Sequence, residues 1–248
     1  MDPYRFFLPA LLPLSGDLIA LPDDQAHHAR TVLRLDPGTP ILLFDGQGHW
    51  TTAALHAAGK ILSAQPTGEL HTDPPPPIHL TLATAIPKGD RAEWLVDQAS
   101  QLNVSALQWV DADRSVVKPR EGGNKLAKWR RIAIESAKQC HRTHLMQIHE
   151  PLPLDQIIAR AAPHPILWLE PRDAATIRPL SAILQQSPTH LTALIGPEGG
   201  WSDREYAHLN TLADASDSHL TRIRLTPTVL RIETACTAIA AIINSHTP

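Results

Sequence analysis

The chain has 248 residues, of which 43% are hydrophobic, and a formal net charge of −3. This length allows two domains with buried cores, and the slightly acidic balance argues against a protein that binds nucleic acid over its whole surface. The only cysteines, Cys140 and Cys236, cannot form a disulfide framework or a four-ligand zinc site by themselves, which fits a reducing cytoplasm.

The beginning of the chain is apolar but broken. Pro9, Pro13 and Asp17 interrupt residues 6–21, and the only basic residue before them is Arg5. No stretch is long enough to span a bilayer, so neither an export signal nor a membrane anchor is predicted.

A small β-rich domain is predicted next. Residues 27–35 are expected to form a helix, and residues 41–44, 50–55 and 60–63 are short β-type runs separated by glycine-containing turns. This pattern is typical of a small β-barrel-like domain. Four consecutive prolines in residues 72–77 then favour a stiff, extended spacer. We therefore expect domains at 1–73 and 74–248.

Strand-type and helix-type segments alternate after the prolines. The expected segments are residues 78–86, 91–102, 106–110, 125–140, 146–149, 154–161, 166–169, 191–195 and 219–225, with helices after the last two. Such alternation predicts a mainly parallel sheet covered by helices. Ligands bind beyond the carboxyl ends of strands in these sheets, so loops 170–173, 196–201 and 226–231 are the expected pocket.

The charge distribution is uneven. Residues 114–144 contain nine lysines and arginines against Glu121 and Glu135, a net charge of +7. This window suits a phosphate-binding surface, although a solvated helix face explains such a run equally well.

The loop after residues 191–195 has the sequence Gly-Pro-Glu-Gly-Gly, and Ser202 and Glu205 follow with the spacing of a capping box. Glycines 196, 199 and 200 allow a ligand to approach the backbone closely. A plain turn is the alternative interpretation. The Walker and dinucleotide-binding glycine patterns are absent from the sequence, which disfavours those nucleotide-binding classes.

The second such unit ends the chain. Residues 219–225 are expected to form a strand, Pro227 breaks it, and residues 231–244 are expected to form a helix rich in alanine and isoleucine.

Motifs throughout the chain, taken together, resemble one family. They are Arg5-Phe6-Phe7, His27-His28, Val32-Leu33-Arg34, Phe44-Asp45-Gly46, Pro87-Lys88-Gly89-Asp90-Arg91, Arg114-Ser115-Val116-Val117-Lys118, Trp129, Ile132-Ala133-Ile134-Glu135, Gln139, Arg142, residues 195–200, Leu230-Arg231 and Glu233-Thr234-Ala235. The chain resembles the 16S ribosomal RNA uridine-N3 methyltransferases, the small-subunit methyltransferase E family of SPOUT enzymes, over nearly its whole length.

The resemblance implies an α/β fold class: a C-terminal SPOUT-type parallel-sheet domain with a trefoil knot, and a small N-terminal PUA-like β-barrel domain. It also implies a cytoplasmic homodimer that uses S-adenosyl-L-methionine and no metal. The implied substrate is a uridine of 16S rRNA, position 1498 in the usual rRNA numbering, in the small ribosomal subunit.

The resemblance assigns roles to three groups of residues. The implied catalytic residues are Arg231, which would hold a uracil carbonyl, and Glu233, which would lie near the sulfonium or take up the N3 proton. The implied cofactor-binding residues are Leu169, Ile195, Gly196, Pro197, Glu198, Gly199, Gly200, Leu225, Leu230 and Thr234. The implied RNA-binding residues are Arg5, His27, His28, Arg34, Lys88, Arg91, Arg114, Lys118, Arg131 and Arg142.

Several interpretations stay open. Glu233 also suits a first-turn acid that favours the helix dipole, and Trp201 suits packing as well as base stacking. At several positions the chain departs from the pattern usual in this family. Thr226, Thr228 and Ile232 stand where glycine, arginine and threonine are usual. Gln98 and Gln101 replace a usual lysine and glutamate, and Cys140 replaces a usual serine. A non-catalytic RNA-binding protein with a degenerate cofactor loop, or a knotted methyltransferase with another RNA target, are therefore the alternatives.

Overall fold

The computed structural model describes residues 3–9, 11–12, 17–58, 61–117, 124–170 and 177–246. The chain forms two compact units. The first comprises Met1–Pro75 and Ile134–Leu145, and the second comprises Pro76–Ala133 and Met146–Pro248. The first unit thus includes the later segment Ile134–Leu145, which the position of the proline run does not predict.

The first unit is built around one sheet. Its strands pair in the order β1-β3-β4-β5-β2, and β6 pairs with β4. All of these pairs are antiparallel except β1 with β3. The elements are β1 (Tyr4–Phe7), β2 (Ile19–Ala20), α1 (Asp23–His27), the π-helical turn η1 (His28–Val32), β3 (Pro40–Phe44), β4 (His49–Ala58), β5 (Ile61–Pro66) and β6 (His71–Thr72).

The helix expected at residues 27–35 begins earlier and ends earlier than predicted. Asp23 and Asp24 form the first turn of α1, where acidic side chains favour the positive end of the helix dipole.

Asp73 ties the later segment into the first unit. Its carboxylate accepts hydrogen bonds from Thr143 Oγ1 at 2.6 Å and from Trp50 Nε1 at 3.0 Å. Burial opposes ionisation of this group, but the two hydrogen bonds outweigh burial and lower the pKa of Asp73.

The second unit is an α/β fold, as the alternating pattern predicts. Its elements are β7 (His79–Thr84), α2 (Arg91–Gln101), β8 (Ala106–Asp111), α3 (Asn124–Gln139, whose end from Ile134 belongs to the first unit), β9 (Gln147–Pro153), α4 (Leu154–Ala161), β10 (Ile166–Leu169), α5 (Leu180–Leu184), β11 (His190–Ile195), α6 (Asp203–Ala213), β12 (Leu220–Ile223) and α7 (Ile232–Ser245).

The six strands of this unit are all parallel and lie in the order β12-β10-β11-β7-β8-β9. The chain builds β7, β8 and β9 outward in one direction, and then places β10, β11 and β12 on the other side of β7. Such a change of direction is where doubly wound folds bind ligands.

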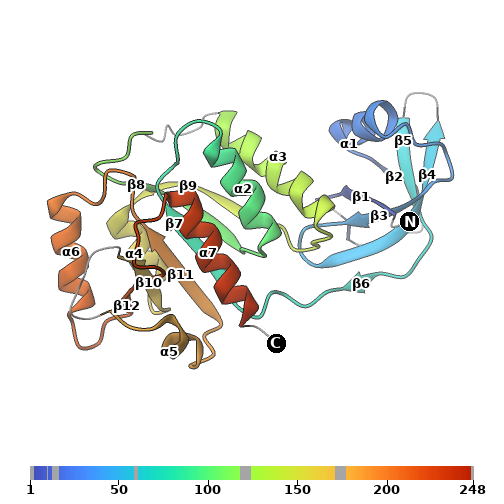
Figure 1. The fold of residues 1–248 in the computed structure, drawn as a ribbon. Coiled ribbons are helices and arrows are strands. Elements are labelled where there is room, and N and C mark those ends of the chain that lie inside the picture. The colour runs from blue at the N-terminus through green and yellow to red at the C-terminus, as the bar shows by residue number, and fades with distance from the viewer. Residues whose placement is uncertain are drawn as a thin grey trace. The chain divides into compact units, whose positions relative to one another are not determined.

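Helices cover both faces of the sheet. Buried side chains of α2 and α7 pack in one core, while α4 and α6 contribute to a second core on the opposite face. Figure 1 shows α7 alongside α2. Both helices present apolar residues at helical spacing, such as Ile232, Cys236, Ile239 and Ile243 in α7, so each buries one face.

Candidate active site

A cavity of about 530 Å³ lies beyond the carboxyl ends of three neighbouring strands. These strands, β12, β10 and β11, end at Ile223, Leu169 and Ile195. The volume lies within the range of roughly 300–1,000 Å³ that is typical of small-molecule sites. The lining residues are Arg91, Leu169, Glu170, Ile195, Gly196, Pro197, Glu198, Gly200, Trp201, Tyr206, Ile223, Arg224, Leu225, Thr226, Thr228, Val229, Leu230, Arg231, Ile232 and Ala235.

Most of the residues expected to bind the cofactor line this cavity. Gly199 and Thr234 are not among the lining residues, and neither is Glu233, although its neighbour Ile232 is. Among the expected loops, 196–201 and 226–231 contribute to the cavity, while residues 171–173 lie outside the described part of the chain.

The glycine loop is shaped by close contact with Trp201. A Cβ atom built on Gly196 would lie 2.9 Å from Trp201 Nε1 and 3.0 Å from its Cε2. Trp201 is buried, and Gly200 has a φ of 71°, a left-handed conformation that favours glycine. Trp201 therefore packs beneath the loop, and Gly196 has no room for a side chain.

Arg91 joins two carboxylates at the edge of the cavity. Its Nη2 lies 2.7 Å from Glu198 Oε1, and its Nη1 lies 3.4 Å from Glu233 Oε1. All three side chains are largely shielded from water, with exposures of 31% for Arg91, 30% for Glu198 and 11% for Glu233. Arg91 thus lines the cavity and connects the glycine loop to the start of α7, while its expected contact with RNA stays a prediction.

Glu233 keeps one oxygen unused. Its Oε2 is buried and has no hydrogen-bond partner among the described residues. A buried carboxylate oxygen without a partner is costly, and such atoms occur at functional sites. One turn further along α7, burial raises the pKa of the Cys236 thiol to about 12, so this cysteine remains neutral.

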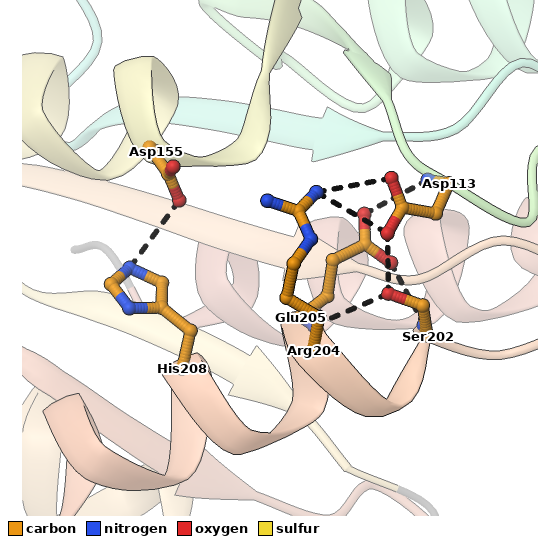
Figure 2. Close-up of polar contacts among 6 residues, drawn as sticks. All are labelled: Asp113, Asp155, Ser202, Arg204, Glu205 and His208. Carbon is orange, nitrogen blue, oxygen red and sulfur yellow. Dashed lines mark hydrogen bonds and ion pairs between the residues drawn. The ribbon is translucent and has the colours of Figure 1, made fainter.

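Glu205 connects the helix after the glycine loop to the end of β8, as Figure 2 shows. Its Oε1 accepts the Asp113 backbone N–H at 2.9 Å, and its Oε2 accepts the Ser202 N–H at 2.8 Å. The Ser202 hydroxyl accepts the Glu205 N–H at 3.2 Å, which completes the expected capping box, and donates to Asp113 Oδ2 at 2.6 Å. One buried carboxylate thus fixes two chain segments.

Arg114 strengthens the same connection. Its Nη1 donates to the Trp201 carbonyl and its Nη2 to Asp203 Oδ1, each at 3.1 Å. A Cβ on Gly199 would meet Arg114 Cβ at 3.4 Å. Arg114 therefore supports the glycine loop, and its expected contact with RNA stays a prediction.

The loop after β12 carries two of the departures from the family pattern. The Thr226 hydroxyl donates to the Thr228 carbonyl at 2.8 Å, and the two hydroxyls lie 3.3 Å apart. Both residues line the cavity. These contacts connect the two threonines within the loop, at positions where the resemblance implies glycine and arginine.

The residues expected to bind RNA in the first unit lie on several elements. Arg5 Nη1 donates to the His141 carbonyl at 3.3 Å, and His27 Nδ1 lies 3.4 Å from Thr31 Oγ1. His27 and Arg34 are exposed, whereas His28 is partly covered. Arg142 is also partly covered, and burial lowers the pKa of its guanidinium to about 10, which leaves it charged at neutral pH.

Much of the basic window is engaged within the protein. Lys138 pairs with Glu135, Lys128 with Glu93, and Arg130 donates to the Ile148 carbonyl. Lys88 and Arg131 are exposed, and Lys118 lies outside the described residues. Lys125, Lys128, Arg130 and Arg131 of α3 are nevertheless all exposed, so this part of the window presents positive charge to solvent.

Tyr206 lines the cavity but was not predicted to do so. It lies in the first turns of α6 and gave no pattern signal. Glu170 directly follows the apolar β10 and is the described residue of the expected loop 170–173 that lines the cavity.

Two further kinds of feature are absent from the described residues. None of their helices has the length and apolar character needed to cross a bilayer. Nor do three or more histidine, cysteine, aspartate or glutamate side chains gather in them in a way that could hold a metal ion.

Two family models match the chain. An RNA methyltransferase domain matches residues 74–244, and an RNA methyltransferase PUA domain matches residues 21–62.

Named relatives agree with these models. The chain is 32% identical to a Synechocystis protein named ribosomal RNA small subunit methyltransferase E, over 92% of this chain and 73% of the relative. A Bacillus subtilis protein of the same name is 27% identical over 86% of this chain and 84% of its own length.

Solved structures are also similar. A putative methyltransferase from Legionella pneumophila with bound S-adenosylmethionine has a TM-score of 0.85 at 28% identity, covering 99% of this chain and 98% of its own. A small subunit methyltransferase E from Neisseria gonorrhoeae, also bound to S-adenosylmethionine, has a TM-score of 0.82 at 27% identity, covering 98% of both chains. Matched along nearly its whole length, the chain belongs to the ribosomal RNA small subunit methyltransferase E family.

Proposed function

We propose that this protein transfers a methyl group from S-adenosyl-L-methionine to N3 of a uridine in 16S rRNA, the position-1498 type, in the small ribosomal subunit. The observation that carries the proposal is the cavity at the carboxyl ends of β10, β11 and β12, where Arg91 contacts both Glu198 and Glu233. This cavity combines apolar walls, close backbone and a cluster of charged groups, as small-molecule sites require.

The residues present fit the cofactor. Leu169, Ile195, Leu225 and Leu230 offer an apolar lining for an adenine ring, while the bare Gly196 leaves the backbone accessible. When bound, S-adenosyl-L-methionine supplies an electrophilic methyl group on a positively charged sulfur. Glu198 provides a negative charge in the lining. Gly199 and Thr234 are proposed to contribute to this site as well, beside the lining residues Glu198, Gly200 and Ala235.

Glu233 is assigned the acceptor of the N3 proton. Attack by a uracil N3 requires loss of its proton, and a carboxylate within hydrogen-bond reach can accept it. Glu233 Oε2 is buried and has no hydrogen-bond partner among the residues described, so its capacity to accept a hydrogen bond is unused. The proposed role requires the side chain to turn toward the cavity that its neighbour Ile232 lines. Arg91 holds the other oxygen and thereby orients the group.

Arg231 is assigned to the uracil. It lines the cavity directly before α7, is exposed, and carries a charge that complements a uracil carbonyl whose negative charge grows as the proton leaves. The target base must leave its stack to reach such a site.

The residues proposed to bind RNA are Arg5, His27, His28, Arg34 and Arg142 of the first unit and Lys88, Arg91, Arg114, Lys118 and Arg131 of the second. A match of residues 21–62 to a PUA domain of RNA methyltransferases supports a role for the first unit in RNA binding. We further propose the trefoil knot, a cytoplasmic homodimer and metal-independent catalysis on family membership. Sedimentation analysis tests the dimer.

The test of function is product identification. Small subunits that lack the modification are incubated with the protein and methyl-labelled S-adenosyl-L-methionine, and the rRNA is digested to nucleosides for mass spectrometry. Label in 3-methyluridine supports the proposal. Label in a ribose-methylated or other nucleoside would support methyltransferase activity but would reject uridine N3 as the methylated atom.

Cofactor titration separates the enzyme from the non-catalytic alternative. Saturable binding of S-adenosyl-L-methionine supports the enzyme. Tight rRNA binding without any cofactor binding would favour a degenerate cofactor loop. The ordered Thr226–Thr228 turn beside an open cavity favours the enzyme.

A further inference from the structure

We propose that a second cavity binds a phosphate group. This cavity lies toward the amino ends of the parallel strands, whereas the candidate active site lies at their carboxyl ends. This cavity of about 200 Å³ is surrounded by four histidines and an arginine: His79, His149, His164, His190 and Arg160. The chemical class of ligand is a tetrahedral oxyanion, supplied either as free phosphate or as a phosphomonoester.

The strands beneath this cavity have a polar end. On the face covered by α4 and α6, β11 presents His190, Thr192 and Leu194 in turn, and β7 presents His79, Thr81 and Ala83. Each strand therefore changes from polar to apolar along one face. His79 and His190 are exposed, so their imidazoles are accessible to a ligand from solvent, while Thr192 beneath them is buried.

The neighbouring strands continue the polar area. Gln108 of β8 pairs in register with His149 of β9, and both line the cavity. The Gln108 amide donates to the Trp109 carbonyl at 2.9 Å and to the Glu150 carbonyl at 2.7 Å. Gln108 is thus fixed by the backbone, and the histidines and Arg160 remain as the groups that face a ligand.

Three of the histidines form a stack. The ring centroids of His164 and His190 lie 4.4 Å apart with an interplanar angle of 17°, and those of His190 and His79 lie 5.2 Å apart with an angle of 25°. Thr189 Oγ1 lies 3.2 Å from His190 Nδ1, which leaves Nε2 of that ring for a ligand. Stacked imidazoles at these distances repel one another when protonated, and an anion relieves that repulsion.

The charges around the cavity are of one sign. None of the described lining residues is an aspartate or glutamate, and Arg160 forms no ion pair within the described parts of the chain. Burial, with His164 and His79, lowers the pKa of His190, and burial, with Arg160, Arg130 and His79, lowers the pKa of His149. A bound anion would reverse the charge part of both shifts.

A metal ion is the competing ligand for a histidine cluster. Among the described residues, no three histidine, cysteine or acidic side chains are arranged to hold one. A guanidinium in the lining also disfavours a cation and suits an oxyanion.

The site is separate from the proposed methyl-transfer site. His190 begins β11, and Ile195 ends it at the active-site cavity. At the rise of a β-strand this separation is about 16 Å. Substitutions of the histidines are therefore expected to leave cofactor binding intact. The phosphate-site proposal and the methyl-transfer proposal can then be tested independently.

The first probe is sulfate, because its charge stays constant over the range in which histidine titrates. The full chain is titrated at about pH 6 and about pH 7.5 at constant ionic strength, and the imidazole resonances are followed by NMR. Binding requires protonated imidazoles, so sulfate is expected to bind about ten-fold more tightly at the lower pH and to raise the pKa of His190.

Three variants make the test specific. His190→Gln and Arg160→Gln are each expected to weaken sulfate binding about ten-fold, by removal of one charged hydrogen-bond donor. His208→Gln is the matched control, since His208 lies on α6 near Asp155, outside this cavity. Unchanged cofactor affinity in each variant shows that the fold is intact.

Two phosphate probes then identify the source of the ligand. Inorganic phosphate and uridine 5′-monophosphate are compared with uridine. Equal affinity for the first two assigns free phosphate, and tighter binding of the monophosphate assigns a phosphomonoester. The proposal is overturned if sulfate leaves the imidazole resonances unmoved, if His190→Gln binds sulfate as the wild type does, or if uridine binds as tightly as its monophosphate.

Discussion

The guanidinium of Arg91 lies 2.7 Å from the Glu198 carboxylate and also reaches Glu233, at 3.4 Å. This contact links the first residue of α2 to the glycine loop after β11 and to the first turn of α7. Three segments that are distant in the sequence therefore meet at one charged group. A partly shielded arginine between two carboxylates orients both of them.

Glu233→Gln should reduce methylation by about 10²–10⁴-fold, the usual contribution of a general base, because the amide cannot accept the N3 proton. Affinity for S-adenosyl-L-methionine should remain nearly unchanged, since Glu233 does not line the cavity. Single-turnover rates and cofactor titrations measure the two effects. Glu150→Gln, at an exposed position, is the control. Equal losses of rate and cofactor affinity would mark Glu233 as a structural residue.

Gly196→Ala should weaken cofactor binding about ten-fold or more, because its new Cβ would overlap Trp201 and displace the loop. Gly199→Ala is a matched change in the same loop, where the nearest atoms would be at 3.4 Å, and should have a smaller effect. Calorimetric titration of both variants checks this. Equal affinities in the two would show that the Trp201 contact does not shape the site.

Glu205→Gln should lower the free energy of unfolding by about 1–3 kcal/mol, because an amide can accept only one of the two backbone N–H groups that the carboxylate now accepts. Cofactor affinity should fall with it, since both partners adjoin the glycine loop. Denaturant unfolding measures the first effect and calorimetry the second. Arg204→Ala on the exposed side of the same helix should change stability by less than about 0.5 kcal/mol. Wild-type stability of Glu205→Gln would contradict the assigned role.

Acid should destabilise the second unit. The pKa values of His149 and His190 are lowered in the folded protein, so below about pH 6.5 the unfolded chain binds more protons than the folded chain. The neutral histidines therefore contribute fully to the free energy of unfolding above this pH. Their contribution is lost as the pH falls through the pKa values that they have in the folded protein. Thermal unfolding between neutral and mildly acid pH should show a smaller loss in a His149→Gln, His190→Gln double variant than in the wild type. An equal loss would remove these histidines as the cause.

The cavity could be anticipated from the sequence because its parts follow local rules. An apolar run before Gly196 indicates a strand that ends in a tight loop, and parallel strands bring such loops to one edge. The role of Arg91 could not be predicted from the sequence. Its partner Glu233 is 142 positions away, and only the packing of α2 beside α7 brings the two side chains together. The contacts of Arg114 with Trp201 and Asp203 could not be predicted for the same reason: a run of positive charge does not reveal which cations form hydrogen bonds within the fold. The polar ends of β7 and β11 are visible in the sequence, as His-x-Thr in both, but only strand pairing makes them one site.

The most direct test of this account compares Arg91→Ala with the wild type in the rate of 3-methyluridine formation, at saturating S-adenosyl-L-methionine and with modification-deficient small subunits. Lys88→Ala, at an exposed position before α2, is the control for general loss of positive charge. The account predicts that Arg91→Ala is slower by at least about ten-fold, because Glu233 loses the contact that orients it, and that Lys88→Ala at saturating RNA keeps the wild-type rate. A wild-type rate in Arg91→Ala would contradict the claim that the Arg91-bridged carboxylates form the methyl-transfer site.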